Sequence, residues 1–125
     1  INPFLIEEQF CKSPFIENMV VLGENQKFAA ALIHPDMTYL KDFCKRHNIA
    51  FTDDASLLAY PEVKAIFNKE LKKYNPLFAH HEQIKSFDLV SEEWSVDNGI
   101  LTPTLKVKRN VIQQRYKDQI EKLFE

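Results

Sequence analysis

The chain has 125 residues, of which 45% are hydrophobic, so it has the length of one domain and enough apolar side chains for a continuous core. Sixteen lysines and arginines stand against eighteen aspartates and glutamates, and this balance argues against a nucleic-acid partner, which would favour a basic excess. No apolar run approaches the roughly 20 residues of a membrane-spanning helix, and the isolated Cys11 and Cys44 indicate reduced, buried thiols in a cytoplasmic protein.

The first segment of the chain predicts a helix. Asn2 is a suitable N-cap, and Pro3 at the first helical position favours a helix that runs to about Lys12. Glu7 lies in the early turns of this helix, where a carboxylate favours the positive end of the helix dipole. We interpret Glu7 in that structural role and not as a catalytic group.

Two apolar runs then predict a hairpin. Residues 19–22 and 28–33 are apolar at successive positions, with a polar, glycine-containing segment between them. Because the apolar residues do not alternate with polar ones, we expect both strands to be covered on both faces by helices. His34 follows the second strand and has no carboxylate or second histidine at a useful spacing, so little indicates a ligand or a catalytic base.

The middle of the chain predicts further helices and a third strand. The expected elements are a helix capped by Asp36 that runs to about His47, a short helical turn from Thr52, a helix from Pro61 to about Tyr74, and a strand over about residues 85–90. Asp53 and Asp54 are interpreted as helix caps and not as metal ligands. His80 and His81 are adjacent and would diverge on a helix, so the sequence predicts no metal site.

Residues 99–109 read GILTPTLKVKR and have the most distinctive chemistry in the chain. Pro103 restricts the backbone and biases Thr102 toward an extended conformation. Asn98 and Gly99 form a dipeptide that is typical of two-residue hairpin turns. The pattern therefore predicts a stiff, projecting segment whose turn lies at Asn98 and Gly99.

The lysines of this segment are expected on one face of a strand. Leu105 and Val107 alternate with Lys106 and Lys108, which would place the apolar side chains on one face and the ammonium groups on the other. Taken alone, a lysine on a strand is ordinarily a solvated surface charge. A terminal helix is predicted from about Arg109.

Together these elements predict an α+β fold for a single domain over residues 1–125. The expected sheet is small and antiparallel, with about three strands plus a short hairpin, and helices flank it.

The order of several short segments resembles the C-terminal domain of acyl-adenylate-forming (AMP-binding) enzymes, and among them the long-chain fatty acyl-CoA synthetases. The resembling segments are INPFLIE at 1–7, SPFIE at 13–17, the strand at 28–35, PEV at 61–63, IKSF at 84–87 and DNGILTPTLK at 97–106. The last segment is the most specific, because other branches of the superfamily carry Ser-Gly-Lys in its place. The resemblance covers nearly the whole chain.

The resemblance implies a two-step ligase that forms acyl-AMP from a fatty acid and ATP, and then transfers the acyl group to CoA. Lys106 would be its catalytic lysine, with Gly99, Thr102, Pro103, Thr104 and Arg109 as the supporting motif. This domain would be a mobile lid, and its own N-terminal domain would hold most of the ATP site, including Mg²⁺. The chain starts with Ile1 and not with Met, which suggests a piece of a longer protein, so we expect it to be inactive alone.

Two alternatives stay open. A noncatalytic α+β interaction module could use a surface patch of Lys64, Lys69, Lys72 and Lys73 for a protein or an anionic membrane. The same lid could also serve a ligase whose acyl acceptor is a carrier-protein thiol. The sequence does not identify the acyl chain length, the cofactor-binding residues or the oligomeric state, and membrane association would be at most peripheral.

Overall fold

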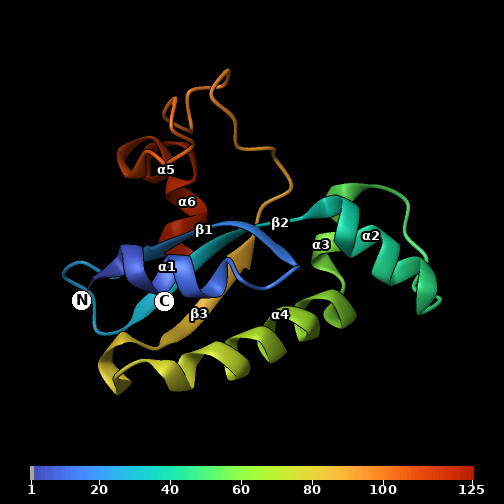
Figure 1. Cartoon of the computed structure of the whole chain (residues 1–125), viewed down its shortest axis with the longest axis horizontal. Coiled ribbons are helices and arrows are strands. Elements are labelled where there is room, and N and C mark those ends of the chain that lie inside the picture. Colours follow the sequence, from blue (N-terminus) through green and yellow to red (C-terminus); the bar gives the residue numbers. More distant parts are fainter. Residues whose placement is uncertain (1) are drawn as a thin grey trace.

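The computed structural model describes residues 2–125 and shows a small sheet with helices on both faces (Figure 1). The elements in chain order are α1 (Pro3–Phe10), β1 (Ile16–Leu22), β2 (Ala29–Pro35), α2 (Met37–Arg46), α3 (Asp54–Ala59), α4 (Pro61–Tyr74), η1 (Asn75–Leu77), η2 (His80–Glu82), β3 (Ile84–Leu89), α5 (Arg109–Arg115) and α6 (Lys117–Leu123). The α+β prediction is confirmed. Within residues 2–125 no helix is long and apolar enough to cross a membrane.

The sheet has the strand order β1-β2-β3, and its two pairings run in different directions. β1 lies antiparallel to β2, with Val21 opposite Ala31, which confirms the predicted hairpin. β3 lies parallel to β2, with Asp88 opposite Leu32, so the prediction of an antiparallel sheet is wrong for this pair. The reason is the long connection through α2, α3 and α4, because such a crossover returns the chain to the end of the sheet where β2 began.

Each face of the sheet has its own hydrophobic core. β2 is buried at all seven of its positions, as the unbroken apolar pattern predicts, and its side chains alternate between the two cores. The first core joins the sheet to α1, α2, α3 and α4, and Phe67 of α4 lies fully buried in it. The second core joins the other face to α5, α6 and the segment after β3, through Trp94, Ile100 and Ile112. Figure 1 shows α4 on one side of the sheet and α5 with α6 on the other.

Several helices begin where the sequence predicts. The side chains of Asn2, Asp36 and Asp53 each accept a hydrogen bond from the backbone N–H three residues further along the chain. These bonds satisfy donors that a helix start leaves without an internal partner. α4 has the predicted bounds, beginning at Pro61 and ending at Tyr74.

The predicted terminal helix is divided into α5 and α6 at Tyr116, where φ is -114° and ψ is 29°. The Tyr116 hydroxyl accepts a hydrogen bond from the indole N–H of Trp94 at 3.1 Å and donates one to Glu92 at 2.5 Å. Arg115 also pairs with Glu92. The break therefore coincides with side-chain bonds to the segment after β3, which the helical pattern of the sequence could not reveal.

Candidate functional site

Residues 99–109, which we call the lysine loop, connect the second core to α5 and lie in the orange segment of Figure 1. Ile100 and Leu101 are buried in the second core and hold one side of the loop. Leu101 forms an antiparallel bridge with Val107, and the N–H of Lys108 donates to the carbonyl of Ile100 at 2.8 Å. The loop is thus a short hairpin with a buried base and an exposed tip.

Thr102 organises the tip of the hairpin. Its carbonyl accepts the N–H of Leu105 at 2.8 Å, and its own N–H donates to the carbonyl of Lys106 at 2.8 Å. Its hydroxyl oxygen accepts the N–H of Lys106 at 3.1 Å and lies 3.1 Å from the hydroxyl of Thr104. The backbone of Lys106 is therefore bonded twice to Thr102, with Pro103 and Thr104 at the turn between them.

The expectation of an extended strand with one apolar face is wrong. Leu105 has φ of 66°, in the left-handed region, and its side chain is 66% exposed. Val107 instead packs against the second core. The tight turn imposes the positive φ on Leu105, so the two apolar side chains do not share a face.

The predicted turn at Asn98 and Gly99 exists, but it precedes the hairpin and does not close its tip. Asn98 Oδ1 accepts the N–H groups of Ser95 and Ile100, both at 3.2 Å, and its amide donates to the carbonyl of Glu93 at 2.7 Å. Gly99 has φ of 83°, where L side chains are disfavoured, and an added Cβ would meet no atom within 4 Å. Gly99 therefore supports the loop through its backbone conformation alone.

Lys106 is exposed at the tip of the hairpin. Its Nζ lies 5.6 Å from the centroid of the Phe4 ring of α1, within the range of a cation–π contact. Among residues 2–125, no carboxylate forms an ion pair with it. The structure therefore leaves this ammonium group available to an anion.

Arg109, three residues after Lys106, joins the end of the lysine loop to two other elements. Its Nη2 lies 2.6 Å from both carboxylate oxygens of Glu7 on α1, and its Nη1 donates to the carbonyl of Val21 at 3.0 Å. Glu7 in turn accepts the N–H of Val21 at 2.7 Å. Because β1 is an edge strand, these side chains bond backbone groups that no neighbouring strand could pair.

Glu7 is the member of this group that the sequence analysis assigned only to the helix dipole. Its side chain is 14% exposed, and burial raises the pKa of its carboxyl above the ordinary 4.5, although the bonds from Arg109 and Val21 oppose the rise. Glu7 and Arg109 lie 102 positions apart, so no local pattern could have paired them. The same holds for Phe4 and Lys106.

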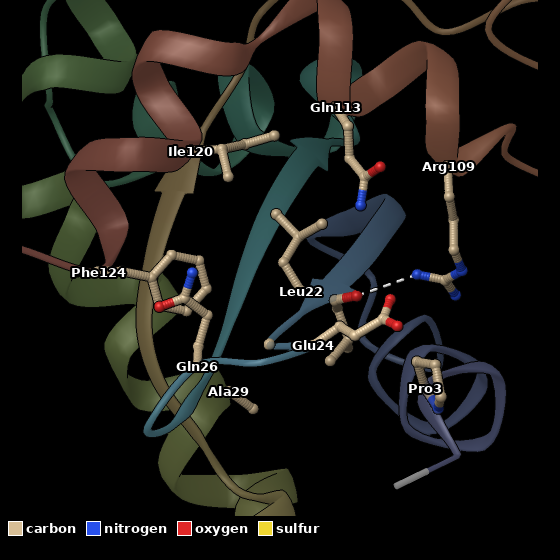
Figure 2. Close-up of a pocket in the computed structure, with 11 residues that line it drawn as sticks. Pro3, Leu22, Glu24, Gln26, Ala29, Arg109, Gln113, Ile120 and Phe124 are labelled. Atoms are coloured by element: carbon tan, nitrogen blue, oxygen red, sulfur yellow. Dashed lines mark hydrogen bonds between the residues drawn. The ribbon is translucent and has the colours of Figure 1, made fainter.

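A cavity of about 370 Å³ lies between the β1–β2 turn, the start of α1, and α5 with α6. Figure 2 shows Arg109 and Gln113 at one side of it, and Ile120 and Phe124 at another. Arg109 is the cation among the lining residues, and its guanidinium is already bonded to Glu7 and Val21. For binding a phosphate, Lys106 is therefore the better candidate.

Three of the four histidines, His34, His80 and His81, were considered as possible ligands or bases from the sequence. His34 is buried, its Nδ1 lies 2.9 Å from Asn18 Oδ1, and its ring stacks on Trp94 with 5.7 Å between centroids. Burial lowers its pKa, which favours the neutral ring. His80 and His81 are both exposed. None of the three lies in the lysine loop.

Within residues 2–125, the side chains that could ligate a metal ion do not gather into a site. In the described part of the chain, no group of three or more His, Cys, Asp or Glu side chains could hold a metal ion, so these residues do not fit a Mg²⁺ site. Cys44 is buried, which raises the pKa of its thiol, but Cys11 is exposed at the end of α1. The prediction that both thiols are buried is wrong for Cys11.

A family model described as "AMP-binding enzyme C-terminal domain" matches residues 1–125. The chain is 30% identical over 125 residues to Long-chain-fatty-acid--CoA ligase FadD15 of Mycobacterium tuberculosis, covering 99% of this chain and 21% of that protein. It is 27% identical over 124 residues to the chloroplastic Long-chain-fatty-acid--[acyl-carrier-protein] ligase AEE15 of Arabidopsis thaliana, covering 99% of this chain and 15% of the relative.

A solved structure shares the fold. The adenylation domain of a carboxylic acid reductase from Segniliparus rugosus, solved with AMP and a carboxylic acid, superposes with a TM-score of 0.76 at 20% identity. The match covers 99% of this chain and 18% of that one. This chain thus spans between 15% and 21% of the length of these three proteins.

Proposed function

Because the chain belongs to the family of AMP-binding enzyme C-terminal domains, we propose that it is that domain of an ATP-dependent, AMP-forming long-chain fatty acid–CoA ligase. The observation that carries the proposal is the exposure of the Lys106 ammonium, which has no carboxylate ion-pair partner among residues 2–125 and lies on a hairpin bonded at its base and its tip. The relative named as a long-chain fatty acid–CoA ligase supports the choice of acyl substrate and acceptor.

The chemistry of the first step explains why a lysine is needed. The carboxylate of the fatty acid attacks the α-phosphate of ATP, forming the mixed anhydride acyl-AMP and releasing pyrophosphate. Two anions approach each other, and negative charge develops on the phosphate oxygens. A compact ammonium group that contacts both reactants stabilises this charge. In the second step the thiol of CoA attacks the acyl carbon and AMP leaves.

In this proposal the domain acts as a lid on its own N-terminal domain, which supplies the pockets for ATP and the fatty acid. Closure brings Lys106 to the α-phosphate and excludes water that would hydrolyse acyl-AMP. Rotation then withdraws the lysine loop before CoA reacts. The proposal also places the enzyme in the cytoplasm, with at most peripheral membrane contact.

A second acceptor deserves a direct comparison, because one relative is named as an acyl-carrier-protein ligase. The adenylation step would be the same, and only the thiol that takes the acyl group would differ. Supplying CoA and a holo acyl-carrier protein in separate reactions with the same acyl-AMP distinguishes the two acceptors. We expect thioester formation with CoA.

The proposal is tested with Lys106→Ala in a polypeptide that joins this chain to its adenylate-binding domain. Removal of one preorganised donor of this kind typically costs about 3 to 4 kcal/mol, or roughly 100- to 1000-fold in rate. Fatty-acid-dependent pyrophosphate exchange should fall by that factor. Lys108→Ala is the matched control, an exposed lysine two residues further along. Equal exchange rates in the two variants would contradict the proposal.

A further inference from the structure

Helix α1 contacts the lysine loop at two points. Phe4 lies under the ammonium group of Lys106, and Glu7 bonds Arg109 at the end of the loop. Residues three positions apart lie on neighbouring parts of a helix surface, so the two contacts come from one side of α1. The helix thus holds both the tip and the end of the loop.

Helix α1 is held in place by its buried side chains and its capped start. Ile6 and Phe10 point into the first core with 1% and 0% exposure. Asn2 and Pro3 define the start of the helix directly before Phe4. The Phe4 ring is therefore presented from a rigid element. It is nevertheless 51% exposed, so the burial of apolar surface accounts for only part of its placement.

A lysine side chain has four rotatable carbon–carbon bonds and loses considerable freedom when it is ordered. An aromatic face below the ammonium restricts that freedom without neutralising the charge, as a carboxylate would. Preorganisation of a catalytic group shortens the search for the reactive geometry. The ring of Phe4 is suited to this role because the contact depends on the π face and not on a counter-charge.

We infer that Phe4 is a positioning residue, which holds the ammonium group of Lys106 in the orientation used for adenylation. The inference rests on the proposed function, since it assigns the residue that orients the lysine of that reaction. In this role Phe4 acts through its contact with Lys106 and needs no contact of its own with ATP or the fatty acid. It adds a residue from the start of the chain to the site.

The test compares Phe4→Leu, which removes the aromatic face but keeps apolar bulk, with Phe4→Trp, which keeps a stronger aromatic face. Leu5→Ala is the control, because Leu5 is the next residue of α1 and is 55% exposed. A cation–π contact at an exposed site corresponds to about a 2- to 5-fold effect on rate. In the polypeptide that includes the adenylate-binding domain, Phe4→Leu should lower kcat of adenylation by that factor with unchanged KM for ATP. Phe4→Trp should retain the wild-type rate, and Leu5→Ala should not change it.

A second readout does not depend on catalysis. In the 125-residue chain, the ring of Phe4 should shift the NMR resonances of the Lys106 side-chain methylene next to Nζ upfield of those of Lys108. Phe4→Leu should abolish this shift and Phe4→Trp should preserve it. Equal adenylation rates in the leucine and tryptophan variants would overturn the inference, as would a faster rate in Phe4→Leu or an absent shift in the wild type. If Lys106→Ala leaves adenylation intact, the proposed function itself fails. If Lys106→Ala slows adenylation but Phe4→Leu does not, only the positioning role of Phe4 fails.

Discussion

Replacing Arg109 by alanine removes the side chain that joins α5 to α1 and to the edge of the sheet. Glu7 then loses both contacts at 2.6 Å, and the carbonyl of the buried Val21 loses its bond at 3.0 Å. Hydrogen bonds to charged groups contribute about 1.5 to 3 kcal/mol, but the Arg109 side chain is 38% exposed, so solvent screening reduces the sum. We expect Arg109→Ala to lower the free energy of unfolding by about 2 kcal/mol near neutral pH.

The pH dependence of this loss identifies its cause. Burial raises the pKa of Glu7 in the folded chain, and Arg109 opposes that rise, so the pKa climbs further in Arg109→Ala. A carboxyl whose pKa is higher in the folded chain than in the unfolded chain stabilises the fold through its bound proton. This contribution is complete below the unfolded pKa of 4.5 and is lost as pH rises through the folded pKa. The deficit of Arg109→Ala relative to wild type should therefore be smallest at about pH 4 and grow toward neutral pH.

Urea unfolding of the 125-residue chain, followed by the fluorescence of its one tryptophan, measures this deficit at each pH. Because both chains carry the same other titratable groups, such as His34, the contribution of those groups to the pH dependence cancels in the difference between the two free energies of unfolding. Glu7→Gln is the matched control, because an amide cannot ionise and Arg109→Ala in that background should show a deficit that does not change with pH. A deficit in Arg109→Ala that is equal at both ends of the pH range would refute the ionic explanation.

Two further substitutions test the backbone of the lysine loop by the same unfolding assay. Leu105→Gly should raise the free energy of unfolding by about 0.5 kcal/mol, because relief of the left-handed strain outweighs the added freedom of the unfolded chain. Leu77 is the control, because it is similarly exposed and does not have a positive φ. Leu77→Gly should lower the free energy of unfolding by about 0.5 to 1 kcal/mol, and an equal change in the two variants would contradict the assignment of strain to Leu105. Gly99→Ala should lower stability by about 1 to 2 kcal/mol from its φ of 83° alone, and a neutral result would show that the turn adapts.

Local sequence patterns predicted the helices well, because their causes are local. Asn2, Asp36 and Asp53 cap helices through side chains only three residues from their partners, and Pro61 begins α4 at the predicted position. The two apolar strands were also predicted, since β2 is buried on both faces.

Features that depend on distant parts of the chain were not predictable in this way. The direction of β3 depends on how the crossover returns the chain, and the break at Tyr116 coincides with bonds to Trp94 and Glu92. In the lysine loop, the alternation of Leu105 and Val107 indicated a strand, but the turn at Pro103 and Thr104 controls the backbone there.

The candidate site was likewise predictable from the sequence only in part. The sequence led to Lys106 through the resemblance of its motif, and the structure places that lysine at an exposed tip. The contacts that hold the loop come from Phe4 and Glu7, about a hundred positions earlier. Their roles follow only from the folded arrangement.

The most direct test of the central claim measures two half-reactions of Lys106→Ala in the polypeptide that includes the adenylate-binding domain. The first is formation of acyl-AMP from fatty acid and ATP, and the second is transfer of the acyl group from supplied acyl-AMP to CoA. If Lys106 serves only adenylation, the first rate falls roughly 100- to 1000-fold while the second stays near that of the wild type. Survival of both rates would show that Lys106 is an ordinary surface charge, and an equal loss of both would show that the substitution disturbs the whole domain.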